Sequence, residues 1–268
     1  MPERQLAAIT GGSSGIGASF ARKLAQRGYD LLLIARREDR MRSLARELAD
    51  AHHVIVDTMA ADLSLDADID RVADRLGSAA NLGLLVNNAG FGSHGFFFET
   101  GVAGQDKMHR LHVLATMRLS HAALSNLVAR GAGGVINVAS VAGFGQAPSN
   151  VSYCATKAWM ISFTEGLSIE LIVKGSPVKV QALCPGFTLS EFHDVLGMDR
   201  SAIPSSLWMP ADFVVEDSLR ALDKGQVVCV PGWRYKLIVR GMKMIPRSIA
   251  AAMTRRFRKP KAAQATSR

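Results

Sequence analysis

The feature that most constrains the fold is a regular alternation of short apolar segments with longer segments of helical periodicity. The chain begins with an apolar run at 6–10, a helical pattern at 16–27, a second apolar run at 30–35 and a charged helical pattern at 38–51. Further strands are predicted at 53–59, 82–87, 134–139, 178–184 and 226–230. Nearly continuous apolar strands with helices between them are typical of a parallel sheet covered on both faces. The sequence therefore predicts a doubly wound α/β domain, in which ligands bind beyond the carboxyl ends of the strands.

Charge divides the chain into two parts. The 268 residues carry a formal net charge of +9, yet residues 234–268 hold eleven Lys and Arg and no Asp or Glu. The segment 1–233 therefore has 21 basic and 23 acidic residues, a net charge of −2. We expect a catalytic domain over 1–233 and a basic, amphipathic extension over 234–268. Because the excess charge belongs to the extension, it does not indicate nucleic-acid binding by the body, and we predict none.

Other bulk features bear on location. No run reaches the roughly 18 apolar residues of a membrane-spanning helix, and the N-terminal residues do not resemble a secretory signal. The three cysteines, Cys154, Cys184 and Cys229, are widely spaced. Such spacing favours a reducing compartment over a disulfide framework or a zinc site. We therefore predict a cytoplasmic protein without a bound metal.

A glycine-rich loop, TGGSSGIG at 10–17, follows the first predicted strand. Gly11, Gly15 and Gly17 can provide a tight turn, close approach of the backbone to a pyrophosphate, and close helix–strand packing. The N-terminus of the next helix would offer unpaired N–H groups and a favourable dipole to phosphates. The spacing departs from the Gly-x-Gly-x-x-Gly fingerprint, so an ordinary turn is the alternative. Its position after the first strand favours dinucleotide binding.

The second predicted strand ends without the acidic residue that would bind the ribose 2′-hydroxyl of NAD. Ala35 stands at that place, followed by Arg36 and Arg37. Guanidinium groups pair with phosphate by charge and by a bidentate fork. A solvated basic start to a helix is the alternative. Together with the glycine loop, the arginine pair predicts NADP(H) in preference to NAD(H).

Five motifs in register resemble the short-chain dehydrogenase/reductase family. Besides the glycine loop they are NNAG at 87–90, Ser140, the pair Tyr153 and Lys157, and PGFT at 185–188. Their order and separations agree with the family from about residue 5 to about residue 230. The resemblance implies an NAD(P)-dependent oxidoreductase acting on CH–OH groups. It also implies a Rossmann-type, mostly parallel seven-stranded sheet with helices on both faces. We also expect a homo-oligomer.

The resemblance further implies a set of contacts to the cofactor. Residues 62–63 would lie by the adenine, 88–90 along the floor of the cleft, and 185–188 against the nicotinamide end. The predicted cofactor-binding residues are Gly11, Ser13, Ser14, Gly15, Ile16, Arg36, Arg37, Asp62, Leu63, Asn88, Ala89, Gly90, Tyr153, Lys157, Pro185, Gly186, Phe187 and Thr188.

Tyr153 and Lys157 are four residues apart and therefore share one face of a predicted helix. The pKa of free tyrosine, about 10, would be lowered by a neighbouring ammonium and by the positive nicotinamide of the oxidised cofactor. Tyr153 could then protonate a carbonyl oxygen while hydride reaches the carbon, and take the alcohol proton in the reverse direction. Ser140, at the end of a strand, could orient the substrate oxygen. By resemblance, Lys157 would also bind the nicotinamide ribose.

The family usually has a catalytic asparagine in the helix before the fifth strand, where this chain has His112. That asparagine helps to hold a water that links the active-site lysine to solvent. A neutral imidazole both donates and accepts hydrogen bonds, and it can titrate near neutrality. We therefore predict that His112 joins Ser140, Tyr153 and Lys157 as a catalytic residue and that turnover falls at mildly acidic pH. The alternatives are a crippled site or a histidine that only packs.

Two segments, 91–100 and 187–209, are expected to flank the substrate. Their apolar side chains include Phe96, Phe97, Phe98, Phe192, Leu196, Met198, Ile203, Leu207 and Trp208. Arg200 is their only basic residue apart from histidines. We predict that a hydrophobic ketone or aldehyde is interconverted with its alcohol. The alternative is a non-catalytic dinucleotide-sensing or scaffold protein, because fold does not fix function.

The extension carries two stripes that lie about 200° apart on a helix. The apolar stripe is Ile238, Met242, Ile245, Ile249, Met253 and Phe257, and the basic stripe is Lys236, Arg240, Lys243 and Arg247. Pro246 is expected to divide the segment or to start a second helix. This shape suits peripheral contact with an anionic membrane. Docking on a partner subunit or packing on the body is the favoured interpretation.

Overall fold

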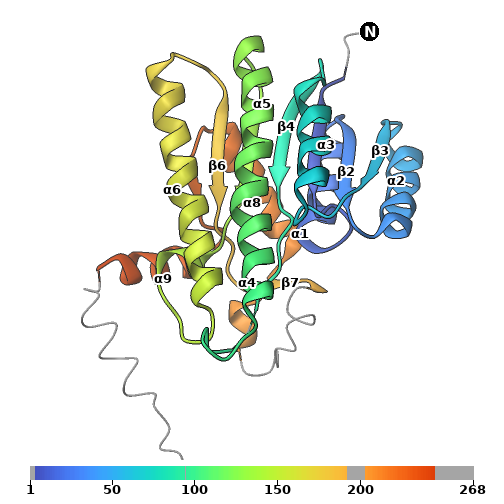
Figure 1. Ribbon diagram of the computed structural model, residues 1–268. Coiled ribbons are helices and arrows are strands. Elements are labelled where there is room, and N and C mark those ends of the chain that lie inside the picture. Colours follow the sequence, from blue (N-terminus) through green and yellow to red (C-terminus); the bar gives the residue numbers. More distant parts are fainter. Residues whose placement is uncertain (1–3, 94, 192–202, 245–268) are drawn as a thin grey trace, which may run out of the picture.

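The computed structural model describes residues 4–93, 95–191 and 203–244, and its central feature is a seven-stranded sheet (Figure 1). The strand order is β3-β2-β1-β4-β5-β6-β9, and all adjacent strands are parallel. The strands are β1 (Leu6–Thr10), β2 (Asp30–Ala35), β3 (Val56–Ala60), β4 (Leu82–Asn87), β5 (Gly134–Val138), β6 (Lys179–Leu183) and β9 (Val228–Cys229). The predicted doubly wound α/β fold is confirmed.

Helices cover both faces of this sheet (Figure 1). They are α1 (Gly15–Gln26), α2 (Glu38–His52), α3 (Asp66–Gly77), α4 (Val102–His109), α5 (Thr116–Arg130), α6 (Val151–Val173), α8 (Ala211–Asp223) and α9 (Trp233–Met244). Side chains alternate between the faces, as in any strand. Ala7 and Ile9 of β1 join the apolar cluster formed with α1, α2 and α8, whereas Leu6 and Ala8 join the cluster formed with α3 and α5.

The strand order places a crevice between β1 and β4. From β1 the chain continues to β2 on one side, and it later returns to β4 on the other side. Such a reversal of strand order opens a ligand crevice at the carboxyl ends of the strands. The glycine loop at 10–17 leaves the end of β1, and residues 88–90 leave the end of β4. The two motifs therefore meet at this crevice.

Two local elements were not predicted from the sequence. The strands β7 (Thr188–Leu189) and β8 (Met209–Pro210) pair in parallel and close the base of the segment expected to cover the substrate. Between α4 and α5 the chain forms a π-helix, η1 (Arg110–Ala115). Such π-helical turns are rare and frequently mark functional sites. His112 lies in the middle of this turn.

The start of the basic extension packs on the body. In α9 the buried side chains are Tyr235 and Val239, whereas Ile238, which the predicted apolar stripe placed on the buried face, is 41 % exposed. The boundary predicted after residue 233 falls within the first turn of α9, so a separate unit over 1–233 stays a prediction. The rest of the two stripes, from residue 245 onward, lies outside the described residues. Within the described part of the chain, every helix is too short or too polar to cross a membrane.

Candidate active site

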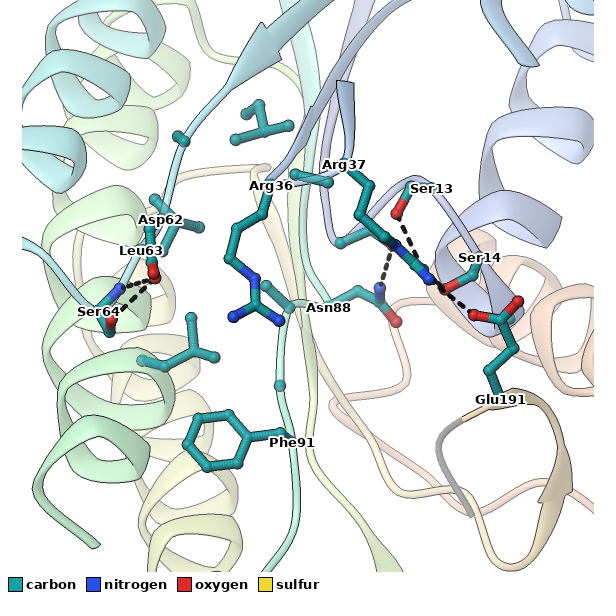
Figure 2. A pocket seen from close by; sticks show the side chains of 18 of the residues that line it. Ser13, Ser14, Arg36, Arg37, Asp62, Leu63, Ser64, Asn88, Phe91 and Glu191 are labelled. Carbon is teal, nitrogen blue, oxygen red and sulfur yellow. Dashed lines mark hydrogen bonds and ion pairs between the residues drawn. The ribbon is translucent and has the colours of Figure 1, made fainter. Parts of the chain in front are cut away.

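A cavity of about 540 Å³ opens at the carboxyl ends of β1, β2 and β4 (Figure 2). Its volume lies within the range of about 300–1,000 Å³ that is usual for ligand sites. Ser190 and Glu191, which follow β7, form part of its wall. The predicted cofactor residues that line it are Gly11, Ser13, Ser14, Gly15, Ile16, Arg36, Arg37, Asp62, Leu63, Asn88, Ala89 and Gly90.

The glycine loop has the geometry of an anion cradle. Gly11 and Gly15 have φ values of +66° and +55°, which favour glycine, and a Cβ on Gly17 would lie 2.2 Å from the Gly11 carbonyl oxygen. The loop leads into α1, but the Ser14 hydroxyl does not cap the helix; it accepts a hydrogen bond from Arg37 Nη2 at 2.8 Å. The first N–H groups of α1 thus keep the capacity to bind phosphate oxygens. The loop therefore fits the pyrophosphate of a dinucleotide.

The floor of the cavity is fixed by hydrogen bonds between β1 and the chain after β4. The Thr10 hydroxyl accepts from the backbone N–H groups of Asn88 and Ala89, both at 2.9 Å. Asn88 Nδ2 donates to the Thr10 carbonyl oxygen at 2.9 Å. At the other end, the Asp62 carboxylate accepts from the backbone N–H and the hydroxyl of Ser64, beside the buried Leu63 (Figure 2). These bonds hold both walls of the cavity in place.

The two arginines that follow β2 have different surroundings. The Arg36 side chain extends into the cavity, and it forms no hydrogen bond or ion pair with any residue that the structure describes (Figure 2). Arg37 bridges the Ser14 hydroxyl and the Glu191 carboxylate, with 2.9 Å between its Nη1 and Glu191 Oε2. Arg40 Nη1 lies 2.6 Å from Glu191 Oε1. These guanidinium groups lower the pKa of Glu191 by hydrogen bonding.

Ser140, Tyr153 and Lys157 lie together beyond the end of β5. Ser140 caps a 3₁₀ turn, η2 (Val141–Phe144), by accepting from the Ala142 N–H at 3.1 Å, and its hydroxyl is hydrogen-bonded to the Tyr153 phenol. Both Tyr153 and Lys157 come from α6, with Lys157 Nζ at 5.7 Å from the centre of the tyrosine ring. The helical spacing therefore brings the phenol and the amine together, and the chain after β5 adds the Ser140 hydroxyl.

Burial dominates the ionisation of this group. The pKa of Tyr153 is raised to about 12, because the loss of water disfavours the phenolate more than the Ser140 hydrogen bond favours it. The expected lowering of this pKa by Lys157 is therefore wrong for these side chains by themselves. Lys157 is 5 % exposed, and burial lowers its pKa to about 7. Its Nζ donates to the Val138 carbonyl oxygen at 2.8 Å.

His112 is fully engaged in local hydrogen bonds. The Phe91 N–H donates to Nε2 at 3.2 Å, so the ring proton belongs on Nδ1, which lies 2.9 Å from the Thr156 hydroxyl. Thr156 in turn donates to the Tyr153 carbonyl oxygen at 3.0 Å. Burial lowers the pKa of His112 well below its usual value. The predicted titration near neutrality is therefore wrong, because a charged ring would have neither water nor a second acceptor.

The PGFT motif lies beside the catalytic group and is held from an unexpected direction. Residues 185–188 do not line the cavity; they follow β6, where the Pro185 carbonyl oxygen accepts from the Val141 N–H at 3.0 Å. From α9, the Tyr235 hydroxyl accepts from the Phe187 N–H at 3.0 Å and donates to the Leu207 carbonyl oxygen at 2.8 Å. Sequence reasoning missed this tyrosine, whose only signal was an aromatic side chain among basic residues at the start of the extension.

The position of the Tyr235 ring explains why residue 186 is a glycine. A Cβ on Gly186 would lie 2.0 Å from the Tyr235 ring, so only glycine fits between β6 and α9. Arg234 adds a second contact by donating to the Ser206 carbonyl oxygen at 2.7 Å. The helix α9 therefore fixes both ends of the segment 187–209.

Both segments that were expected to flank the substrate carry aromatic side chains. In the first, Phe96, Phe97 and Phe98 are exposed, with the rings of Phe96 and Phe98 stacked at 5.8 Å. In the second, the rings of Phe187 and Trp208 lie 5.4 Å apart. The apolar side chains Phe192, Leu196 and Met198, which were expected to flank the substrate, and the basic residue Arg200 lie outside the described residues. Among the residues that the structure describes, no cluster of His, Cys, Asp or Glu could hold a metal ion.

Comparisons with known proteins agree with this geometry. Residues 5–200 match the family model described as short chain dehydrogenase. The curated 3-oxoacyl-(acyl-carrier-protein) reductase FabG of Rickettsia prowazekii (strain Madrid E) is 30% identical over 210 residues, which cover 78% of this chain and 83% of that protein.

Solved structures are similar over nearly the whole chain. A short-chain dehydrogenase from Sphingobium yanoikuyae in complex with NADPH is 33% identical, with a TM-score of 0.82 and coverage of 97% of this chain and 99% of that chain. The bulky-bulky ketone specific alcohol dehydrogenase from Comamonas testosteroni is 30% identical, with a TM-score of 0.78 and coverage of 91% and 96%.

Proposed function

The chain belongs to the short-chain dehydrogenase/reductase family, an oxidoreductase family that binds a nicotinamide dinucleotide and acts on alcohol and carbonyl groups, and on this premise we propose a more specific activity. The protein is an NADP(H)-dependent carbonyl reductase or alcohol dehydrogenase for hydrophobic substrates. The observation that carries this proposal is the hydrogen-bonded pair of Ser140 and Tyr153 with Lys157 beside it.

The catalytic roles follow from the state of these side chains. A pKa of about 12 keeps Tyr153 protonated at neutral pH, so the phenol carries the proton that a carbonyl oxygen needs. The positive charges of Lys157 and of the oxidised nicotinamide would lower this pKa toward the working pH, where proton transfer is most efficient. Ser140 orients that oxygen by hydrogen bonding. The bound nicotinamide dinucleotide supplies the hydride in reduction and accepts it in oxidation. In the oxidative direction Tyr153 takes the alcohol proton, which Lys157 makes easier when it is charged. His112 is a positioning residue, because it acts on Tyr153 through Thr156.

The preference for NADP(H) rests on the end of β2. Ala35 provides no carboxylate for a ribose 2′-hydroxyl, and the Arg36 guanidinium extends into the cavity (Figure 2). A 2′-phosphate would give this cation a strong partner. The solved relative from Sphingobium yanoikuyae, which contains NADPH, supports this choice. We propose that the predicted lining residues hold the adenine half of the cofactor and that residues 185–188 lie near its reactive end.

A hydrophobic substrate is supported by the aromatic side chains of the two segments expected to flank it. Phe96, Phe97 and Phe98 expose large apolar surfaces, and the rings of Phe187 and Trp208 lie 5.4 Å apart within the segment 187–209. The Comamonas testosteroni relative, described as specific for bulky-bulky ketones, points to the same class.

The activity is tested by NADPH consumption with the full-length protein. Ketones with two bulky aromatic or alkyl groups should be reduced faster than a polar ketose. The variant Tyr153→Phe should retain NADPH binding, measured by fluorescence, and lose most turnover, because the proton donor is gone. A Tyr153→Phe protein with near-normal turnover would sink the proposed catalytic site, and equal rates for the ketose would sink the substrate class.

Assembly and location remain proposals. The side chains of Ile169, Ile172 and Val173 on α6 are exposed and apolar, which supports the expected homo-oligomer. Sedimentation of the purified protein tests this expectation. The cysteines Cys154, Cys184 and Cys229 are all free and buried. This state accords with the reducing, cytoplasmic compartment that we predict.

A further inference from the structure

Glu191 connects the segment after β7 to two arginines, Arg37 in the wall of the cavity and Arg40 on α2. Its two carboxylate oxygens are shared between Arg37, at 2.9 Å, and Arg40, at 2.6 Å. The chain at this point lies directly against the glycine loop, since a Cβ on Gly15 would come within 3.0 Å of Ser190 Cβ. Glu191 therefore stands in the wall of the cavity, in contact with one of the two arginines that follow β2 (Figure 2).

We propose that Glu191 determines how strongly the protein discriminates NADP(H) from NAD(H), because its carboxylate competes with a ribose 2′-phosphate for Arg37 and Arg40. This inference rests on the proposed preference for NADP(H) and adds the residue that limits it. Arg36 offers its guanidinium without such a competitor among the described residues. Glu191 thus divides the basic group into one available cation and two that are already paired.

The charges decide the direction of the effect. A phosphomonoester carries a charge of about −1.5 to −2 and three acceptor oxygens, so it binds guanidinium groups more strongly than a carboxylate does. The 2′-phosphate must, however, displace the Glu191 carboxylate from the arginines or be repelled by it. NAD(H) lacks the phosphate, so Glu191 does not oppose its binding. Removal of the carboxylate charge therefore favours NADP(H) alone.

The ion pairs themselves do little for folding. The side chains of Arg37, Glu191 and Arg40 are 45 %, 46 % and 52 % exposed. Exposed pairs of this kind contribute about 1 kcal/mol or less, which corresponds to about a fivefold change in an equilibrium constant. The variant Glu191→Gln should therefore fold normally, and the expected change in affinity is of similar size, about three- to tenfold.

The experiment compares two nucleotide fragments that differ only in the 2′-phosphate. Binding of 2′,5′-ADP and of 5′-AMP to the full-length protein is measured by isothermal titration calorimetry, together with NADPH and NADH. The variants are Glu191→Gln and a matched control, Glu38→Gln. Glu38 pairs with Arg42 at 3.1 Å at the exposed start of α2, so the control removes one nearby charge without touching Arg37 or Arg40.

The proposal expects Glu191→Gln to tighten 2′,5′-ADP and NADPH about three- to tenfold, with 5′-AMP and NADH unchanged and the control close to wild type. A gain shared by both fragments, no change at all, or weaker binding of 2′,5′-ADP would overturn it. Weaker binding of NADH and 5′-AMP would also overturn it, because Glu191 would then bind the ribose 2′-hydroxyl. The proposed function is judged separately, by the wild-type ratio of NADPH to NADH affinity. A selectivity that Glu191→Gln creates in a protein without one would support this inference while refuting the proposed preference.

Discussion

Replacement of Lys157 by methionine should raise the free energy of unfolding near neutral pH, because it removes a buried amine whose protonation destabilises the folded protein. Lys157 Nζ is buried beneath the active site, where it donates to the Val138 carbonyl oxygen at 2.8 Å and lies 3.5 Å from Met160 Sδ. None of these neighbours carries a negative charge, so burial lowers the pKa of Lys157 from 10.5 to about 7. The protonated amine therefore destabilises the folded chain. Methionine has nearly the same length and carries no charge.

The pKa shift fixes both the size and the sign of the effect. A lysine pKa that falls from 10.5 to about 7 on folding costs the protonated form about 5 kcal/mol. Between these two pH values the unfolded chain binds more protons than the folded chain, so the free energy of unfolding rises with pH. Below about pH 7 the full destabilisation is present. From pH 7 to pH 9, Lys157 should contribute a rise of about 2 kcal/mol.

The assay is urea unfolding of protein freed of nucleotide, at several pH values between 7 and 9. Lys157→Met should be more stable than wild type at pH 7, and this advantage should shrink as the pH rises. Lys174→Met is the matched control, because Lys174 is exposed at the end of the same helix. The reasoning is refuted if wild type and Lys157→Met gain the same stability between pH 7 and pH 9. Such a result would mean that Lys157 keeps its charge in the folded protein.

Three further results are expected. Arg36→Asp should raise the Kd for NADPH by about ten- to a hundredfold and leave the Kd for NADH unchanged, because a charge-assisted phosphate contact is replaced by repulsion. Fluorescence titration measures both constants, and an equal loss of affinity for the two nucleotides would contradict this. His112→Asn should retain turnover and have the wild-type pH profile down to about pH 5.5, since the imidazole of the wild type is neutral there. His112→Leu should lose most kcat, because the Thr156 hydroxyl no longer accepts a hydrogen bond from the ring. A Leu variant as active as wild type would show that the ring only packs. Tyr235→Phe should raise KM for bulky ketones more than it lowers kcat, because the hydrogen bond from the hydroxyl to the Leu207 carbonyl oxygen is lost. The same loss should lower the free energy of unfolding by about 1 kcal/mol in chemical unfolding. An unchanged KM would mean that α9 does not position the segment 187–209.

The parts of the molecule that could be predicted are those determined locally. The strands β1 and β2 could be predicted directly from runs of apolar residues, because both faces of a parallel strand are buried. The cradle at Gly11 and Gly15 was predictable because positive φ angles in a strand-to-helix turn need glycine. The placing of Tyr153 and Lys157 together followed from the helical repeat alone.

The parts that could not be predicted depend on contacts distant in sequence. Glu191 has its partners in the loop after β2 and in α2, about 150 residues earlier, and nothing near Glu191 in the sequence points to them. The pKa of Tyr153 depends on how much water the folded site excludes, which sequence spacing does not reveal. The π-helix around His112 has residues that suit an ordinary helix, and the hydrogen-bond partners of His112, Phe91 and Thr156, lie 21 and 44 residues away in the sequence.

The extension shows the limits of periodicity more directly. Ile238 and Met242 belong to the predicted apolar stripe, and Met242 packs against Gly145, but Ile238 is 41 % exposed while Tyr235 and Val239 are buried. Hydrophobicity alone ranks isoleucine above tyrosine for burial. A tyrosine whose hydroxyl meets both a donor and an acceptor can nevertheless be buried at little cost.

The single hydroxyl of Tyr235 has a consequence for how enzymes of this shape can diversify. It holds Phe187 and Leu207, so the two ends of the nineteen-residue segment between them are fixed at one point. The entropy of closing such a loop grows only slowly with its length, by about 0.6 kcal/mol for each doubling. Insertions and deletions beyond Ser190 and Glu191, which belong to the wall of the cofactor cavity, would therefore leave the catalytic group and the cofactor cleft almost undisturbed. Selection can lengthen, shorten or replace that remainder to change the substrate, provided that Tyr235 and Gly186 are inherited together.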